Sequence, residues 1–283
     1  MTVSQMKLQI SNHWSSWLQK IRVRRGWHPE IPSATEIEVK ALQDGVLELK
    51  LAGGNRRNVL GRSTIDYIER MVANPPTGTK VIVITAALPD FCAGYDLMEA
   101  NHANAIDLIA RETNFDSLRK SQVPILVALH GNVIGGGLEL ALSADIRLAS
   151  PDTVISIPAS QLGLVYSETG IRLVVAAVGD SVARALFLGG RKISADSALS
   201  MGLISEIVGR DQLRDRTIEL ANEIALWPSA ATSGNRQILD AIAGRIAVDT
   251  TELRRRSFDQ NGELAKTIAD FAAERFQNPR RTQ

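Results

Sequence analysis

The stretch of sequence that decides the fold is VALHGNVIGGGLELALSADIRLAS, residues 127–150. It begins inside an apolar run, residues 124–129, of the kind that forms a strand covered on both faces. Three consecutive glycines at 135–137 then indicate a turn, and the apolar residues after them continue as a helix through Ala144. A second strand-like segment, residues 146–148, follows directly. Strand, turn, helix and strand in succession are typical of a parallel sheet.

The same alternation extends on both sides of this stretch. In the segment LELKL, residues 47–51, leucines alternate with charged residues, which predicts a half-buried strand. Ser63 is expected to cap the next helix, and residues 81–84 form a continuous β-branched run that predicts another buried strand. Beyond about residue 210 only helical patterns follow, so the sequence predicts an α/β fold with a helical C-terminal region. The other expected elements are a strand at 154–157 and helices at 63–72, 103–119, 211–226, 229–247 and 249–276.

The composition excludes several classes of protein. The chain has 283 residues, and its 32 Lys and Arg residues balance 31 Asp and Glu residues, which argues against a basic protein that binds nucleic acid. A single cysteine, Cys92, allows no intrachain disulfide and fits a reducing compartment. No apolar run approaches the roughly 18 residues of a membrane span, and the first 30 residues lack a signal-peptide core. We therefore expect a cytoplasmic enzyme with no membrane span and no nucleic-acid partner.

The first 34 residues differ from the rest of the chain. They contain three of the four tryptophans, and Trp14, Trp17, Leu18 and Ile21 have the spacing of an amphipathic helix. Two interpretations stay open, an arm that binds a surface and a helix packed on its own domain or on a neighbouring subunit. The expected organisation is an N-terminal arm at 1–34, an α/β core at 35–210 and a helical region at 211–283.

Two glycine-containing turns follow buried strands. FCAGYDL, residues 91–97, comes after the strand at 81–84, and GGGLE, residues 135–139, comes after the strand at 124–129. Loops at the carboxyl ends of parallel strands form the ligand crevice, and a turn that enters a helix presents free N–H groups. Two such turns side by side could direct two donors at one oxygen, as in an oxyanion hole. The alternative is that both are tight turns without chemistry. A phosphate loop is disfavoured, because no Lys-Ser/Thr pair follows the glycines.

Several segments in the same order resemble the crotonase (enoyl-CoA hydratase/isomerase) superfamily, over about residues 36–277. The resemblance implies a crotonase-like fold of stacked ββα turns, in which residues 211–283 support a homotrimer or a hexamer. It also implies an acyl thioester substrate, carried by coenzyme A or by an acyl-carrier protein, whose carbonyl becomes an enolate. Coenzyme A is then part of the substrate, and no separate cofactor and no metal are expected. The segments that carry the resemblance are residues 57–60, 91–97, 127–150, 158–179 and 190–208.

The same resemblance implies binding roles for particular residues. Matched position by position, the backbone N–H groups of Tyr95 and Gly136 would form the oxyanion hole. Arg57 matches a position where family members often carry a basic residue near the coenzyme A phosphates, although a solvated surface arginine is the alternative. The other substrate-binding residues expected from the 91–97 motif are Ala93, Asp96 and Leu97.

The acid and base residues depart from the pattern of the family's hydratases, which use two glutamates to activate a water molecule. Glu139 matches the first glutamate and lies in the first turn of a helix, where the dipole favours a carboxylate. The second falls on Ala159, inside the segment 158–179 that matches without a gap. Because alanine cannot move a proton, simple water addition is disfavoured.

Two nearby residues could restore polar chemistry. Tyr166 lies where many hydratases have proline, and its region is similar to methylmalonyl-CoA decarboxylase, whose active-site tyrosine matches it. Glu168 lies one residue beyond the aspartate position of dienoyl-CoA isomerases and could form a proton shuttle with Glu139. The sequence therefore favours a lyase or isomerase that decarboxylates its substrate or moves a double bond, with Glu139, Tyr166 and Glu168 as catalytic candidates. The alternatives are a hydratase, a C–C hydrolase of a free diketone and a non-catalytic binding protein.

Overall fold

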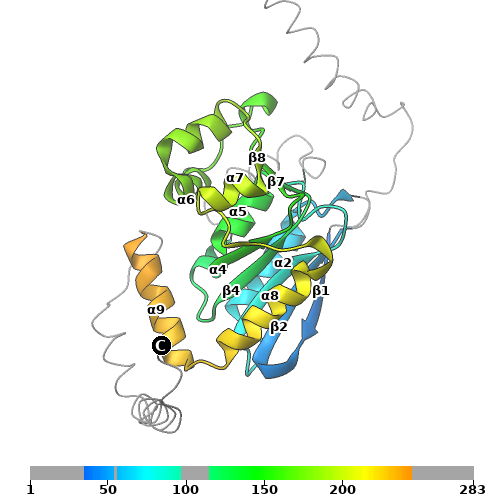
Figure 1. Ribbon diagram of the computed structural model, residues 1–283, viewed down its shortest axis with the longest axis vertical. Coiled ribbons are helices and arrows are strands. Elements are labelled where there is room, and N and C mark those ends of the chain that lie inside the picture. Colours follow the sequence, from blue (N-terminus) through cyan, green and yellow to red (C-terminus); the bar gives the residue numbers. More distant parts are fainter. Residues whose placement is uncertain (1–34, 54–55, 97–114, 244–283) are drawn as a thin grey trace, which may run out of the picture. The chain divides into compact units, whose positions relative to one another are not determined.

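The largest sheet has six strands in the order β1-β2-β3-β4-β6-β9 (Figure 1). The first pair, β1 and β2, is antiparallel, and every later pair in this sheet is parallel. The computed structural model describes residues 35–53, 56–96 and 115–243. The strands are β1 (Glu36–Ala41), β2 (Val46–Ala52), β3 (Val81–Ala86), β4 (Ile125–Leu129), β6 (Ile146–Ala149) and β9 (Glu206–Ile207).

The continuous apolar runs form the middle of this sheet, as predicted. In β3, Val81 and Val83 pack against α8 (Arg210–Ala225), which lies across one face of the sheet (Figure 1). Ile82 and Ile84 alternate with them and belong to the main hydrophobic cluster on the other face. That cluster also contains the apolar residues of α2 (Arg62–Ala73). The β-branched run therefore marks a strand with both faces covered.

A smaller sheet adjoins the turn before α5 (Gly136–Ser143). Its order is β5-β7-β8, with bounds Asn132–Ile134, Val154–Ser156 and Ile193–Ser194. An isolated bridge between Cys92 and Val133 connects β5 to the loop after β3. The sequence patterns did not predict β5, because three residues are too few to establish a strand period.

Two expectations about the first half of the chain are wrong. Glu48 is buried, not on a half-exposed strand, because Arg214 of α8 covers it and forms an ion pair with it. Ser63 does not cap α2, since Gly61 occupies the N-cap position and no side chain caps this helix. The predicted apolar face of α2 is confirmed, because Ile65, Ile68 and Val72 are all buried.

From Arg210 to the last described residue the chain is helical, as expected. The helix α8 ends close to the predicted Trp227-Pro228 boundary, and the sequence patterns did not predict the long helix α6. No helix among the described residues is long and apolar enough to cross a membrane. The arm at 1–34, most of the helix expected at 103–119 and the helix expected at 249–276 lie outside the described residues. The other helices are α4 (Asp116–Arg119), α6 (Glu168–Phe187), α7 (Ala195–Ser200) and α9 (Ser229–Ile242).

Candidate functional site

The two glycine-containing turns lie side by side. The Cys92 carbonyl accepts a hydrogen bond from Ile134 N at 3.0 Å, and Cys92 N donates to the Asn132 carbonyl at 3.1 Å. Gly94 has a φ of +98°, and a Cβ atom there would lie only 3.0 Å from the Ile134 carbonyl oxygen. This close main-chain approach requires glycine. The predicted adjacency of the turns at 91–97 and 135–139 is therefore present.

Tyr95 and Gly136, the two expected oxyanion donors, are in direct contact. A Cβ atom on Gly136 would lie 2.8 Å from Cε2 of the Tyr95 ring, so only glycine fits beneath the ring. Gly136 is the first residue of α5, and the first N–H groups of a helix have no acceptor within it. The N–H groups of Leu138 and Glu139 both donate hydrogen bonds to the Gly135 carbonyl. The oxyanion role of Tyr95 and Gly136 stays a prediction.

Glu139 places a carboxyl group beside these turns. The residue is only 3% exposed, and its Oε2 accepts a hydrogen bond of 2.7 Å from the Tyr95 hydroxyl. A Cβ atom on Gly170, in the first turn of α6, would lie 3.2 Å from the same oxygen. The carboxyl group is thus enclosed between the turn at 91–97 and the start of α6. Since a buried carboxylate is stabilised by hydrogen bonds, Tyr95 supplies the kind of partner that Glu139 needs.

Tyr166 lies against the same group. Its hydroxyl oxygen is buried and has no hydrogen-bond partner among the described residues. The hydroxyl lies 3.1 Å from where a Cβ atom on Gly135 would be, and the ring meets Phe187 edge-on at 5.4 Å. Burial raises the pKa of Tyr166 well above its ordinary value, and the charge of Glu139 raises it further. The phenol therefore stays neutral and keeps its hydroxyl proton.

The position of the second hydratase glutamate is apolar. Ala159 is 4% exposed and belongs to the main hydrophobic cluster. Its carbonyl accepts hydrogen bonds from Leu162 N at 3.1 Å and Leu164 N at 2.9 Å, which close a short turn. The protein therefore presents a methyl group, not a carboxylate, at this position.

Glu168 is not brought together with Glu139. It is the first residue of α6, after the N-cap Ser167, and its side chain is 69% exposed. It forms an ion pair with Arg172 one turn later, at 2.5 Å. The structure thus places Glu168 outside the group formed by Glu139, Tyr95 and Tyr166. The proton shuttle between Glu168 and Glu139 stays a prediction without geometric support.

The described residues expected to bind coenzyme A lie in the turn at 91–97 or are bonded to it. Arg57 is half-exposed and forms an ion pair with the buried Asp90. This pair and two hydrogen bonds from Asn132 lower the pKa of Asp90, against the opposing effect of burial. Ala93 N donates to the Arg57 carbonyl at 3.0 Å, and the buried Asp96 pairs with Arg56. Leu97 lies outside the described residues.

Cys92 is inert in this arrangement. It is completely buried, and burial raises the pKa of the Cys92 thiol to about 12. It therefore carries no thiolate at neutral pH. No group of three possible metal ligands occurs among the described residues.

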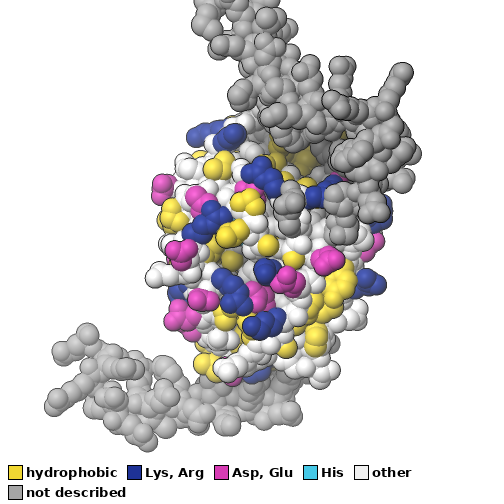
Figure 2. Space-filling view, turned by 90° about the vertical axis from the view of Figure 1, so that its right-hand side faces the viewer, with side chains coloured by type: hydrophobic (Ala, Val, Ile, Leu, Met, Phe, Trp, Pro, Cys, Tyr) yellow, Lys and Arg dark blue, Asp and Glu magenta, His cyan; other side chains and the backbone are white. Residues whose placement is uncertain are grey.

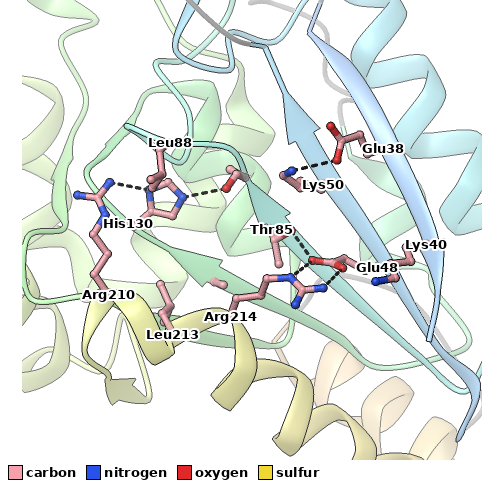
Figure 3. A pocket seen from close by; sticks show the side chains of 12 residues that line it. Glu38, Lys40, Glu48, Lys50, Thr85, Leu88, His130, Arg210, Leu213 and Arg214 are labelled. Carbon is pink, nitrogen blue, oxygen red and sulfur yellow. Dashed lines mark hydrogen bonds and ion pairs between the residues drawn. The ribbon is translucent and has the colours of Figure 1, made fainter. Parts of the chain in front are cut away.

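A charged pocket lies elsewhere, between the outer face of the large sheet and the start of α8 (Figure 3). Its volume is about 470 Å³, and charged side chains of both signs line it. Glu48 accepts hydrogen bonds from Thr85 and Arg214, while Glu38 pairs with Lys50. The ring nitrogens of His130 lie near backbone carbonyls and Arg210. Positive and negative side chains also interleave on the face drawn in Figure 2. None of the predicted catalytic residues lines this pocket.

One contact in the site was not anticipated from the sequence. The family resemblance assigns Tyr95 a role through its backbone N–H, whereas the structure also brings its hydroxyl to Glu139. These residues are 44 positions apart, and no spacing pattern connects them. The only signal in the sequence is that a tyrosine follows Gly94 in a turn expected beside Glu139.

Comparisons with known proteins agree with the fold and with the order of the motifs. A family model described as Enoyl-CoA hydratase/isomerase matches residues 41–275. "Probable enoyl-CoA hydratase echA6" of Mycobacterium leprae (strain TN) is 32% identical over 203 residues, which cover 70% of this chain and 80% of that protein. "Methylglutaconyl-CoA hydratase, mitochondrial" of Mus musculus is 27% identical over 221 residues, which cover 75% of this chain and 70% of that protein.

A solved structure has the same architecture. The enoyl-CoA hydratase subunit I structure from Geobacillus kaustophilus HTA426 superimposes with a TM-score of 0.76 at 23% identity. The match covers 86% of this chain and 97% of that one. The predicted crotonase-like fold is therefore confirmed. With the family model spanning most of its length, the chain belongs to the enoyl-CoA hydratase/isomerase family of the crotonase superfamily.

Proposed function

We propose that this protein forms the enolate of an acyl thioester and protonates it again, without adding water. The expected reactions are decarboxylation or double-bond migration, as in a lyase or an isomerase. The observation that carries the proposal is that one buried carboxyl group, Glu139, and a buried phenol, Tyr166, both lie against Gly170, while position 159 is a buried methyl group. Water addition by two carboxylates needs a second proton-transfer group that the described residues do not supply at position 159.

Both reactions pass through an enolate of the thioester, which in double-bond migration is extended over the γ-carbon. In decarboxylation, the bond between the α-carbon and the carboxylate breaks, CO₂ leaves, and its electron pair passes into the thioester carbonyl. Tyr166 or a protonated Glu139 then gives a proton to the α-carbon. In double-bond migration, ionised Glu139 removes a proton from the α-carbon of a 3-enoyl thioester and a proton returns at the γ-carbon. The negative oxygen that forms in either case would be stabilised by the N–H groups of Tyr95 and Gly136.

The names of the relatives support an acyl-CoA substrate and keep hydration as the competing activity. The relatives quoted above are named as hydratases, one of them for methylglutaconyl-CoA. The similarity of the Tyr166 region to methylmalonyl-CoA decarboxylase stays a prediction, as does a cytoplasmic location. Ala159 also favours a second candidate, a protein that binds acyl thioesters without turning them over.

The deciding experiment is mass spectrometry of the purified protein with a panel of thioesters in deuterated water. The panel contains malonyl-, methylmalonyl-, crotonyl- and 3-enoyl-CoA. Loss of CO₂ with deuterium at the α-carbon, or deuterium-labelled double-bond migration, is the expected result. Gain of water by crotonyl-CoA at ordinary enzymatic rates would contradict the proposal. Tight binding without any α-proton exchange would favour the non-catalytic candidate.

Tyr166→Phe separates the two expected reactions. The variant keeps the ring against Phe187 and removes only the buried hydroxyl. If Tyr166 is the proton donor, decarboxylation falls on the order of 10²-fold or more, because a positioned acid typically contributes that much. Double-bond migration by Glu139 should change much less. An unchanged decarboxylation rate would exclude Tyr166 as the donor.

We also propose a homotrimer or a hexamer. Large apolar side chains lie exposed at the end of the described chain, on α9 and just before it. Leu239 is 66% exposed, Ile242 is 78% exposed and Trp227 is 56% exposed. Light scattering of the purified protein measures the state directly, and a monomer at micromolar concentration would contradict this proposal.

A further inference from the structure

We propose that the side chain of Tyr95 is a positioning residue for Glu139, and that Tyr95 therefore serves the site with its side chain as well as with its backbone. The inference rests on the proposed function for its kinetic consequences, but the contact itself is independent of any substrate. The contact joins the turn at 91–97 to the carboxyl group of Glu139. It is a buried hydrogen bond of 2.7 Å from Tyr95 Oη to Glu139 Oε2.

The backbone around Tyr95 is fixed on both sides. Leu60 N donates to the Gly94 carbonyl at 2.8 Å, and Asp96 N donates to the Leu60 carbonyl at 2.9 Å. Tyr95 itself pairs with Leu60 in an isolated parallel bridge. These backbone contacts restrict the main-chain torsion angles around Tyr95. The position from which the Tyr95 side chain extends toward Glu139 is therefore fixed.

The ring is fixed as well. Tyr95 is 7% exposed and belongs to the main hydrophobic cluster. Its ring covers Gly136 so closely that a Cβ atom there would lie 2.8 Å from two of the ring carbons. Because α5 begins at Gly136 and carries Glu139 in its first turn, the ring and the carboxyl group rest on the same helix end. The geometry of donor and acceptor is thus set by packing.

The consequence concerns the two oxygens of the carboxyl group. Oε2 is held by Tyr95, so the side-chain torsion of Glu139 is restricted and its two oxygens are no longer equivalent. A phenol that donates to a carboxylate also stabilises the charged form, which opposes the effect of burial. Tyr95 thereby favours a Glu139 that is ionised and correctly oriented. Among the described residues, Tyr166 and Cys92 are titratable groups beside this cluster, and burial raises the pKa of each, so both stay neutral.

Tyr95→Phe tests the inference with little disturbance. The variant retains the backbone N–H and the ring over Gly136, and loses only the hydroxyl. We expect kcat to fall about ten- to a hundredfold, as for the loss of a hydrogen bond to a charged group. The KM should change by less than about threefold, because the change is at the reacting centre and not in substrate binding. The acid limb of the kcat–pH profile should move to higher pH, because the carboxylate loses a bond that favours its charged form.

Tyr67→Phe is the matched control. The chain has three tyrosines, and Tyr67 lies on α2 with its ring near Arg70, outside the cluster. Removal of its hydroxyl should leave kcat, KM and the pH profile as they are in the unchanged protein. An equal loss of kcat in Tyr67→Phe would mean that the kinetic effect reflects general destabilisation, which would overturn the inference.

An infrared measurement tests the hydrogen bond from Tyr95 to Glu139 without requiring turnover. The carboxylate stretching band of Glu139 is identified as the band that Glu139→Gln removes. In Tyr95→Phe this band should shift, since one oxygen loses its donor, while in Tyr67→Phe it should stay in place. An unmoved band overturns the inference even if kcat falls. If the protein turns over no thioester, the proposed function fails while the band still tests the contact.

Discussion

Arg236 on α9 donates a hydrogen bond from Nε to Asp145 Oδ2 at 2.9 Å, across 91 residues of sequence. The same carboxylate oxygen accepts a bond of 2.7 Å from Ile125 N at the start of β4. Arg236 is 6% exposed and also donates to the carbonyls of Leu118 and Ser121. One buried arginine therefore attaches α9, through Asp145, to the start of β4 in the interior of the sheet.

Arg236→Ala should lower the free energy of unfolding by about 3–5 kcal/mol, the usual result when one partner of a buried ion pair is removed. Urea denaturation followed by circular dichroism measures the change. Arg184→Ala is the control, because Arg184 pairs with Asp180 on the surface, where both side chains are about two-thirds exposed. That change should cost less than about 1 kcal/mol. Equal effects in the two variants would show that Arg236 does not anchor α9.

Glu139→Gln should lower kcat by a factor on the order of 10²–10⁴, the range typical of a positioned acid or base. Glutamine keeps the size of the side chain and can still accept a bond from Tyr95, so the fold should be retained. Glu168→Gln is the matched control, since its exposed carboxylate pairs with Arg172. Its kcat should stay within about twofold of the unchanged protein. A large loss in Glu168→Gln would restore the two-carboxylate shuttle and count against the single-carboxyl interpretation.

Gly137→Ala and Gly234→Ala should have opposite effects on stability. A Cβ atom on Gly137 would lie 2.7 Å from Cys92 Cβ and 2.9 Å from the Cys92 carbonyl oxygen. We expect a loss of about 1–3 kcal/mol from such overpacking, beyond any gain in helix propensity. Around a Cβ on Gly234, in α9, nothing lies within 4 Å, so alanine there should stabilise the helix by about 0.5–1 kcal/mol. Thermal unfolding of both variants compares them, and equal signs would contradict the packing of α5 on Cys92.

The buried thiol of Cys92 predicts a stability that falls at alkaline pH. Its pKa is raised from an ordinary value of 9.0 to about 12, so the folded state holds its proton more tightly than the unfolded state. The associated stability is fully present below pH 9 and is lost as the pH rises from about 9 to about 12. Cys92→Ala should therefore show a shallower decline of unfolding free energy over this range. In the folded protein, iodoacetamide should not react with Cys92 at pH 8. Rapid labelling under native conditions would contradict its burial.

The sequence predicted the parts of the fold that depend on local patterns. The β-branched run at 81–84 and the apolar run at 124–129 became β3 and β4, and both strands are buried as expected. Contacts between distant segments were not predictable in this way. The burial of Glu48 depends on Arg214, which arrives 166 residues later on α8. An alternating strand pattern contains no information about a helix that distant.

The same distinction applies to the candidate site. The adjacency of the two turns follows from parallel topology, which places the carboxyl ends of neighbouring strands together. The outward side chain of Glu168 depends on where α6 begins, and Ser167 fixes that by accepting a hydrogen bond from Gly170 N at 3.0 Å. The bond from Tyr95 to Glu139 depends on how far one ring extends across Gly136. Neither detail has a period or a spacing by which a sequence could reveal it.

The two turns are held together partly by backbone hydrogen bonds, which do not depend on the side chains proposed to act on the substrate. Backbone hydrogen bonds join Cys92 to Asn132 and Ile134, and Gly135 N adds a bond of 2.9 Å to the Ser156 carbonyl. Side-chain replacements that leave the glycines in place do not break these bonds. A lineage could therefore exchange a carboxylate for a methyl group at position 159 without rebuilding the scaffold. The same backbone arrangement can therefore be retained while the side chains at the site change, which is how a single fold accommodates several reactions.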